Sequence, residues 1–370
     1  MKLAHVPDPV ARQPWGVIAP LLALVLLGTA VLHSAAGGSW QPYAASHLMR
    51  FAVFLAMALV IARIPQDFFV KMAYPAYAGV LVLLVLVEAL GAIGGGSQRW
   101  LNLGFMTLQP SELMKPTIVL VLAAFYSNLP PGMTGSWRGL LPALILLGLP
   151  AVLVILQPDL GTALAICFGG VVVMFLAGLP LSWFLGAGAV AAVAAPLAFF
   201  TLLHDYQRNR VLVFLDPESD PLGTGYHITQ SKIAIGSGGI FGKGFGNGSQ
   251  SHLDYLPEAH TDFVFATMSE EWGMLGGFFV LLVYAQVLRW GLNVARQAPN
   301  RFSMLLAAGL TATVFFYAAI NLLMVMGLAP VVGIPLPFVS HGGSSMMTVM
   351  ICFGVIMAVQ RWSRKGGTIT

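Results

Sequence analysis

One acidic residue, Asp262, lies where a polar stretch of the chain ends and an apolar stretch begins. The segment from Leu256 to Phe263 contains Asp262 next to its end. A carboxylate at a membrane edge is partly desolvated, which raises its pKa and strengthens it as a base. Such a base can deprotonate a hydroxyl group, which is otherwise a poor nucleophile at neutral pH. Because Asp also caps helix N-termini well, the residues alone leave a catalytic and a capping role open for Asp262.

Three further charged residues lie within or between apolar stretches. Lys115 follows Glu112 by three residues, so both side chains share one helix face and can form an ion pair. Asp159 follows Gln157-Pro158 between two apolar runs. Ionisable groups inside a membrane usually pair and face the interior of the helix bundle. These residues could order a site or only hold helices together.

Basic and aromatic residues supply other candidates for ligand binding. Arg208 and Arg210 would point the same way in an extended segment, and Arg suits phosphate oxygens. Both could equally hold their loop by pairing with neighbouring acids. Arg99 and Trp100 follow the glycines at 94–96, and an aromatic ring there is either an interface anchor or a platform for a ligand.

The glycines at 236–244 do not form a phosphate-binding P-loop. That motif would need Gly at 237 and Ser or Thr at 244, whereas the chain has Ser237 and Gly244. We interpret the stretch as a flexible loop pressed against the membrane surface. Cys167 and Cys352 both fall in apolar runs, and their placement indicates neither a disulfide nor a metal pair.

The elements that must position these residues are membrane helices. The chain of 370 residues is 58% hydrophobic and only 9% charged, against about 25% charged residues in soluble domains. Its apolar runs are continuous, which excludes a β-barrel, and a bilayer core needs roughly 20 apolar residues per helix. We predict an all-α, polytopic integral membrane protein with about ten transmembrane helices, near 15–33, 45–63, 72–91, 111–127, 139–157, 160–178, 182–203, 268–288, 303–326 and 343–361.

Basic residues predict the orientation of these helices. With the N-terminus inside, 11 of the 18 bases lie in cytoplasmic tails and turns, and only Asp8 and Asp67 of the 14 acids do. Both termini are then cytoplasmic. A large extracytoplasmic loop, 204–262, joins helices 7 and 8 and carries seven of the 14 acids and four of the eight histidines. Residues 1–370 form one integral membrane domain, and bases near the inner surface explain the net charge of +4 without nucleic acid.

Five segments, in chain order, resemble those of the SEDS family, the polytopic glycosyltransferases for shape, elongation, division and sporulation. They are Gln98-Arg99-Trp100-Leu101, Gln109-Pro110-Ser111-Glu112, Gln157-Pro158-Asp159-Leu160-Gly161, Leu256 to Phe263, and Pro335 to Ser340 with the glycines that follow. The stretch from Asp205 through Tyr226-His227 to Asp262 is most similar to the RodA branch, which acts in cell elongation. One departure is His341, where the family usually has Tyr.

The resemblance implies a peptidoglycan glycosyltransferase of the cytoplasmic (inner) membrane. It would polymerise lipid II into β-1,4-linked glycan strands on the outer face during cell elongation, with undecaprenyl diphosphate as leaving group. Asp262 would be the general base, and Glu112, Lys115 and Asp159 would line the cavity beside it. The partners implied are lipid II, a class B penicillin-binding protein that acts as transpeptidase, elongation-complex proteins and the lipid bilayer, but no nucleic acid.

The roles of several residues and of a cofactor stay open. Lys115 could supply positive charge where the leaving group develops negative charge. We expect Glu258, His260 and Ser340 to support the site from behind the residues that touch substrate. No nucleotide cofactor is implied. A divalent cation, Mg²⁺ or Mn²⁺, could neutralise the diphosphate, although the sequence shows no dedicated metal motif.

A rival interpretation is a flippase or transporter for the lipid-linked precursor, since broken helices and charges within the membrane are typical of transporters. The sequence shows no inverted repeat, and its polar residues collect on one side, whereas a transporter needs access from both.

Overall fold

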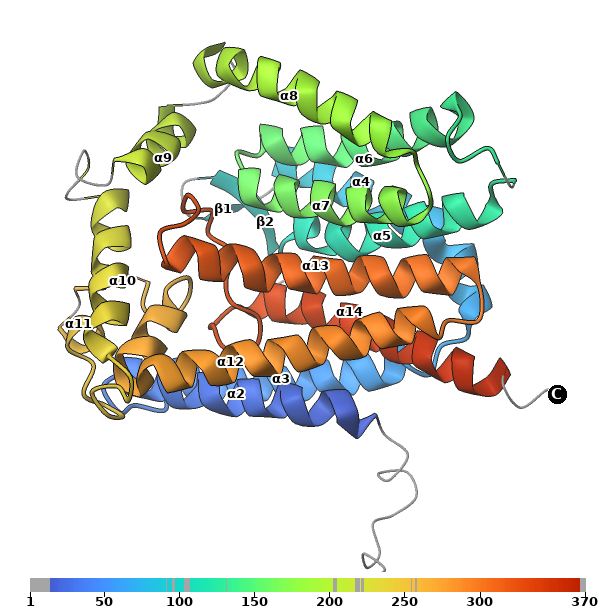
Figure 1. The fold of residues 1–370 in the computed structure, drawn as a ribbon. Helices are drawn as coiled ribbons and strands as arrows, with labels where there is room; N and C mark the ends of the chain where they lie inside the picture. The colour runs from blue at the N-terminus through green and yellow to red at the C-terminus, as the bar shows by residue number, and fades with distance from the viewer. Residues whose placement is uncertain are drawn as a thin grey trace, which may run out of the picture.

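The chain folds into a bundle of long helices. The computed structural model describes residues 14–90, 92–94, 97–102, 107–130, 132–201, 205–216, 220, 223–253, 255–256 and 258–366. Most of the long helices run side by side, while α8 lies apart from them and α10 stands across one end of the bundle (Figure 1). The start of α2 and the end of α14 lie at the opposite end of the bundle from α10 (Figure 1).

Each of the ten predicted apolar runs is a helix, which confirms the all-α prediction. These helices are α2 Trp15–Ala35, α3 Tyr43–Ile61, α4 Gln66–Leu90, α5 Pro110–Asn128, α6 Trp137–Leu156, α7 Leu160–Leu176, α8 Leu181–Thr201, α12 Val264–Arg296, α13 Arg301–Val325 and α14 Gly343–Gly366. Within the described residues, seven of the helices are long and apolar enough to cross a membrane: α2, α3, α4, α6, α12, α13 and α14.

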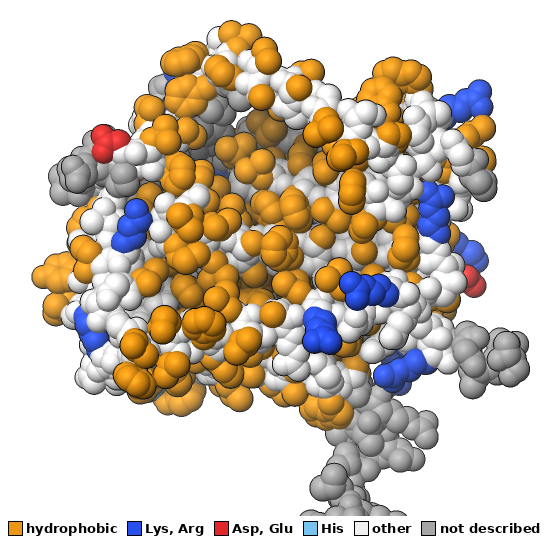
Figure 2. Space-filling model, viewed as in Figure 1, with side chains coloured by type: hydrophobic (Ala, Val, Ile, Leu, Met, Phe, Trp, Pro, Cys, Tyr) orange, Lys and Arg blue, Asp and Glu red, His pale blue; other side chains and the backbone are white. Residues whose placement is uncertain are grey.

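The core of the bundle forms around α5, α13 and α14. Their largest fully buried side chains include Tyr126, Tyr317 and Phe353. In contrast, α8 exposes most of its described side chains, such as Val193 and Phe200. Apolar side chains cover much of the face in Figure 2, and Lys and Arg gather at the end where α12 joins α13. This pattern fits a bundle surrounded by hydrocarbon with its basic end at one membrane surface.

A small antiparallel sheet follows α4, which the sequence analysis did not predict. Its strands are β1 Ala92–Gly94, β2 Ser97–Asn102 and β3 Thr107–Leu108. Ala92 pairs with Trp100, and Leu101 pairs with Leu108. Arg99 and Trp100 therefore lie on a strand, not beside a bare hinge. The glycines at 95 and 96 lie outside the described residues.

The predicted extracytoplasmic loop contains helices of its own: α9 Asp205–Leu215, α10 Thr224–Gly238 and α11 Ser249–His252. The expectation that Arg208 and Arg210 share one face of an extended segment is therefore wrong. Helical residues two apart point to different sides, because each step turns the direction by about 100°.

Glycines after α10 pack against a break in α12 instead of forming a free loop. α12 contains a non-helical residue, Gly273, with φ 64°. Around this break, Lys243 N donates to Glu270 O (3.0 Å), and Met274 N donates to Gly239 O (2.9 Å). A Cβ added at Gly242 would clash with the carbonyl oxygen of Glu271. The segment thus satisfies backbone groups that the broken helix cannot pair, which a membrane helix requires.

Candidate functional site

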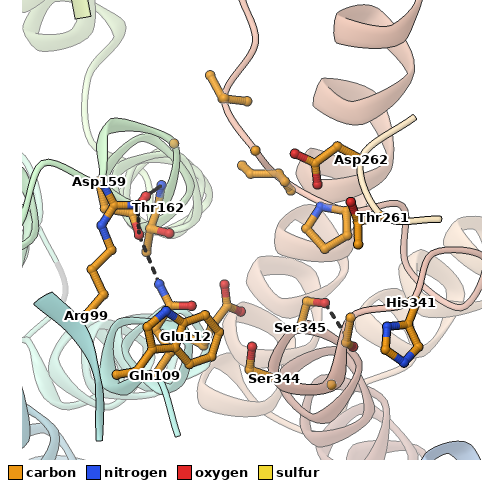
Figure 3. Close-up of a pocket in the computed structure, with 18 of the residues that line it drawn as sticks. Arg99, Gln109, Glu112, Asp159, Thr162, Thr261, Asp262, His341, Ser344 and Ser345 are labelled. Atoms are coloured by element: carbon orange, nitrogen blue, oxygen red, sulfur yellow. Dashed lines mark hydrogen bonds and ion pairs between the residues drawn. The ribbon is translucent and has the colours of Figure 1, made fainter. Parts of the chain in front are cut away.

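A cavity of about 830 Å³ opens where the N-terminal ends of α5, α7, α12 and α14 meet (Figure 3). Residues of α3, β2 and the segment 332–335 complete its wall. Each α-helix carries a partial positive charge at its N-terminus. The convergence of four such ends makes the cavity a favourable place for negative charge, and three carboxylates line it: Glu112, Asp159 and Asp262.

Asp262 lies at the upper part of this cavity in Figure 3, with its carboxylate turned into the open space. The helix that follows begins at Val264 with Phe263 as its N-cap. Asp262 therefore does not occupy the capping position, which was the alternative role. Its backbone carbonyl accepts a hydrogen bond of 2.9 Å from Asn321 Nδ2, and the same nitrogen donates to Ile334 O at 2.8 Å. Asn321 thus fixes the backbone on which the carboxylate sits.

Asp159 is the N-cap of α7, and its carboxylate also faces the cavity. One oxygen accepts from the backbone N–H of Thr162 at 3.1 Å. The other accepts from Gln109 Nε2 at 3.0 Å and lies 3.9 Å from Arg99 Nη1. Such a cap stabilises the start of a helix and places negative charge at its positive end. Asp159 therefore has a structural task in addition to lining the cavity.

Arg99 and Trp100 both line the cavity, which fits the ligand-platform alternative that the sequence left open beside an interface anchor. Arg99 donates from Nε to the carbonyl oxygen of Gln157 at 2.9 Å, and its Nη2 donates to that of Pro158. With the Asp159 contact, the guanidinium holds the turn that precedes α7. Arg99 therefore joins strand β2 to the turn before α7, which forms part of the cavity wall.

The predicted pair of Glu112 and Lys115 forms, with 2.6 Å between Lys115 Nζ and Glu112 Oε1. The hydroxyl of Tyr317, from α13, accepts from Lys115 Nζ at 2.8 Å and donates to Glu112 Oε2. Glu112 lines the cavity, but Lys115 is only 1% exposed and lies behind it. The expectation that Lys115 lines the cavity is therefore wrong, since Glu112 and Tyr317 hold its ammonium group in the core.

Arg208 does not line this cavity. Arg208 and Arg210 both belong to α9, and Arg208 Nη2 donates to the carbonyl oxygen of Phe200 in α8 at 2.7 Å. The side chain of Arg210 lies outside the described residues. The contact of Arg208 joins α9 to α8, which favours the structural alternative for this residue.

Glu258 and His260 shape the turn that leads into Asp262. Glu258 has φ 54° and accepts a hydrogen bond of 2.6 Å from Thr261 Oγ1. The His260 ring stacks on Tyr43 with 4.2 Å between ring centroids. These contacts connect the turn to α3 and fit the expected supporting roles.

Ser340 is buried and accepts a hydrogen bond from the backbone N–H of Leu336 at 2.9 Å. It therefore stabilises the turn at 336–340 and does not line the cavity. The next residue, His341, does line the cavity, and its backbone N–H donates to His260 O at 2.9 Å. The two loops at the mouth of the cavity are thereby joined.

Sequence reasoning missed Arg50, which lines the cavity from α3. Its Nη1 lies 2.9 Å from Nε2 of His341. Burial, together with the charges of Arg50 and His260, lowers the pKa of His341 to about 4. The position of Arg50 well inside the apolar run 45–63 was the available signal, because intramembrane charges usually mark functional sites.

No metal cage is evident in the part of the chain that the structure describes: no three His, Cys, Asp or Glu side chains there could hold an ion together. Both carboxylate oxygens of Glu112 and both of Asp159 already accept from protein donors. These two residues therefore fit a dedicated metal centre poorly.

Comparisons with known proteins agree over nearly the whole chain. The family model for cell cycle proteins of the FtsW, RodA and SpoVE type matches residues 15–365. The chain is 45% identical over 346 residues to the peptidoglycan glycosyltransferase MrdB of Escherichia coli K12, covering 92% of this chain and 91% of MrdB. It is 37% identical over 284 residues to the stage V sporulation protein E of Bacillus subtilis, covering 77% of each.

Two solved structures share the fold. One is of a peptidoglycan synthase complex that coordinates polymerization and crosslinking; it matches with a TM-score of 0.80 at 32% identity, covering 95% of this chain and 98% of the other. The rod shape determining protein RodA of Thermus thermophilus matches with a TM-score of 0.69 at 28% identity, covering 96% and 98%.

Proposed function

The chain belongs to the SEDS family of FtsW, RodA and SpoVE proteins, and from that premise we propose that it is a peptidoglycan glycosyltransferase of the RodA type. It is a multi-pass membrane protein, and both the elongation branch and the polymerase activity are consistent with its 45% identity to MrdB. The observation that carries the mechanism is the placement of Asp262 in a cavity built from four helix N-termini.

The reaction is the polymerisation of lipid II. The 4-hydroxyl of the acceptor GlcNAc attacks C1 of the donor MurNAc, and its proton passes to the Asp262 carboxylate. As the new C1–O bond forms, the bond from C1 to the diphosphate oxygen breaks, and undecaprenyl diphosphate leaves with the electron pair. A β-1,4 bond from an α-linked donor makes the mechanism inverting.

The surroundings of Asp262 suit a general base. The Asn321 side chain donates to the backbone carbonyls of Asp262 and Ile334 and so fixes the position of this turn. A catalytic base must reach the proton that it abstracts, and the Asp262 carboxylate is turned into the open space of the cavity (Figure 3). Glu112 and Asp159 line the same cavity, but Glu112 pairs with Lys115 and Asp159 caps α7.

The position of the cavity favours action on the outer face of the membrane. The helix N-termini that surround it lie at the bundle end opposite the start of α2 and the end of α14 (Figure 1). The bases near the start of α2 and the end of α14 favour a cytoplasmic location for both termini. We further propose a class B penicillin-binding protein as partner, together with elongation-complex proteins, because a structural relative is a complex that couples polymerization to crosslinking.

The divalent cation stays a prediction. Because Glu112 and Asp159 fit a metal cage poorly, we expect any Mg²⁺ or Mn²⁺ to arrive bound to the substrate diphosphate and to need few protein ligands. Polymerisation assayed with EDTA and then with restored Mg²⁺ tests this. Unchanged activity in EDTA would contradict a cation requirement.

The direct test supplies purified protein and its transpeptidase partner with outward-facing lipid II and looks for glycan strands. The proposal expects polymer that grows with time and is absent without the protein. The rival, a flippase, draws support from the broken helix α12 and its buried acids. Transfer of lipid II across vesicle membranes without any polymer would favour that rival and defeat the proposed function.

A further inference from the structure

The four helix N-termini around the cavity differ in their charged neighbours. α5 has Glu112 in its first turn, α7 is capped by Asp159, and Asp262 lies two residues before α12. No acidic residue occurs in the first turn of α14. Its neighbour is Arg50 instead: a Cβ placed on Gly343 would lie 3.5 Å from Arg50 Cζ. Three of the four ends therefore have a carboxylate, and the fourth has a cation.

Arg50 is better placed than the other nearby cations to receive an anion. Lys115 is buried behind the wall in its network with Glu112 and Tyr317. Arg99 lines the cavity, but its three guanidinium nitrogens face Gln157 O, Pro158 O and the Asp159 carboxylate. Within the described residues, the guanidinium of Arg50 has one side-chain partner, the neutral ring of His341.

His341 holds Arg50 without neutralising its charge. A guanidinium can only donate, so Nε2 of His341 must accept, and the ring proton is then on Nδ1. Ser46 Oγ lies 3.1 Å from the same nitrogen, and Tyr43 meets the ring edge-on at 5.2 Å between centroids. A carboxylate at position 341 would also orient Arg50, but it would cancel the charge that an anion needs. A neutral acceptor leaves that charge in place.

We propose that Arg50, positioned by His341 beside the start of α14, binds the diphosphate of a lipid-linked substrate. This inference rests on the proposed function, which supplies a substrate with a diphosphate. Arg forks match phosphate oxygens in pairs, and N–H groups in the first turn of a helix lack intrahelical partners. In Figure 3, His341 and Ser345 lie on the Asp262 side of the cavity, with Arg99 and Asp159 opposite. The diphosphate would thus be bound near the base.

The test measures equilibrium binding of undecaprenyl diphosphate and of uncharged undecaprenol to the protein in lipid nanodiscs, by native mass spectrometry. Arg50→Gln should weaken binding of the diphosphate about 10- to 100-fold, as expected for hydrogen bonds to a charged group, and leave undecaprenol binding unchanged. Arg289→Gln removes the same charge from the exposed surface of α12 and serves as the matched control. Equal diphosphate affinity in wild type and Arg50→Gln would overturn the proposal.

The role of His341 has its own readout. His341→Phe keeps an aromatic ring but removes the acceptor, so diphosphate affinity should fall. His341→Tyr offers a hydroxyl that can accept from Arg50, and it should restore most of that affinity. If the ring of His341 had only a structural role, His341→Phe and His341→Tyr would bind the diphosphate with the same affinity. Once Arg50 is changed to Gln, His341→Phe should cause no further loss, and an additive loss would contradict positioning through Arg50.

The diphosphate bound by Arg50 could belong to the donor or to the acceptor substrate, and kinetics on lipid II distinguish the two. A fall in kcat for Arg50→Gln assigns the site to the donor, whose diphosphate gains charge in the transition state. A rise in KM alone assigns it to the acceptor. The binding measurement needs no turnover, so it stays informative even if the wild-type protein makes no glycan, a result that would defeat only the proposed function.

Discussion

Replacing Lys115 by Met tests whether the buried network behind the cavity stabilises the bundle. Met keeps the length of the side chain but removes the ammonium group. Glu112, itself 6% exposed, would then keep Tyr317 as its partner in this network and lose the countercharge 2.6 Å away. Breaking a buried ion pair by removing one partner typically costs about 3–5 kcal/mol of the free energy of unfolding.

The same network predicts a ranking of variants. Tyr317→Phe removes hydrogen bonds to both ions but leaves the ions paired, so it should cost about 1.5–3 kcal/mol. The double variant Glu112→Gln with Lys115→Met leaves no buried charge unpaired. It should therefore lower the free energy of unfolding by less than the sum for Glu112→Gln and Lys115→Met alone, because the effects of residues in one network are not additive.

Reversible unfolding in mixed micelles, followed by tryptophan fluorescence, measures these costs. Lys71→Met is the matched control, since Lys71 is exposed on α4; it should change the free energy of unfolding by less than about 0.5 kcal/mol. A cost for Lys115→Met no larger than for Lys71→Met would refute the structural reasoning. Exchanging the two charges (Glu112→Lys with Lys115→Glu) then separates stability from catalysis, because full activity would indicate a purely structural pair.

Further predictions follow from the cap, the broken helix and the cavity histidine. Asp159→Ala removes the cap of α7 and should cost about 0.5–2 kcal/mol in unfolding experiments, whereas Asp159→Asn, which can still cap, should cost less. Gly242→Ala should destabilise more than Gly246→Ala, since both have positive φ but only the first Cβ meets backbone; equal losses in thermal unfolding would argue against the packing of this segment. The lowered pKa of His341, about 4 against 6.5 ordinarily, means that the folded state resists its protonation. Wild type should lose stability as pH falls from about 6.5 to about 4, and His341→Gln should lose less over that range.

The transmembrane helices could be predicted because their signal is local. Each apolar run from 15–33 to 343–361 became a helix, since a bilayer demands both apolarity and internal hydrogen bonding. Most ends lie within a few residues of those expected, but α4 begins at Gln66 instead of 72 and α12 continues to Arg296 instead of 288. The pairing of Glu112 and Lys115 could also be predicted, because three residues along one helix fix their proximity.

What could not be predicted depends on contacts between distant segments. Tyr317 lies 202 residues from Lys115 along the chain, and no local pattern distinguishes it from other core aromatics. Lys115 was expected in the cavity from the family resemblance. Its spacing from Glu112 places both residues on one helix face but does not fix how deeply Lys115 is buried. The glycines near 242 were interpreted as flexible, although they approach α12 closely at Gly273, a break that its apolar sequence does not reveal.

The measurement that tests the central assignment most directly is lipid II polymerisation by Asp262→Asn, in complex with the transpeptidase. The variant keeps the size of the side chain and the backbone hydrogen bond from Asn321, so it should fold like wild type while glycan synthesis is abolished. Asp67→Asn, an exposed acid at the start of α4, controls for loss of charge and should polymerise normally. Near-normal glycan synthesis by Asp262→Asn would contradict its role as the base.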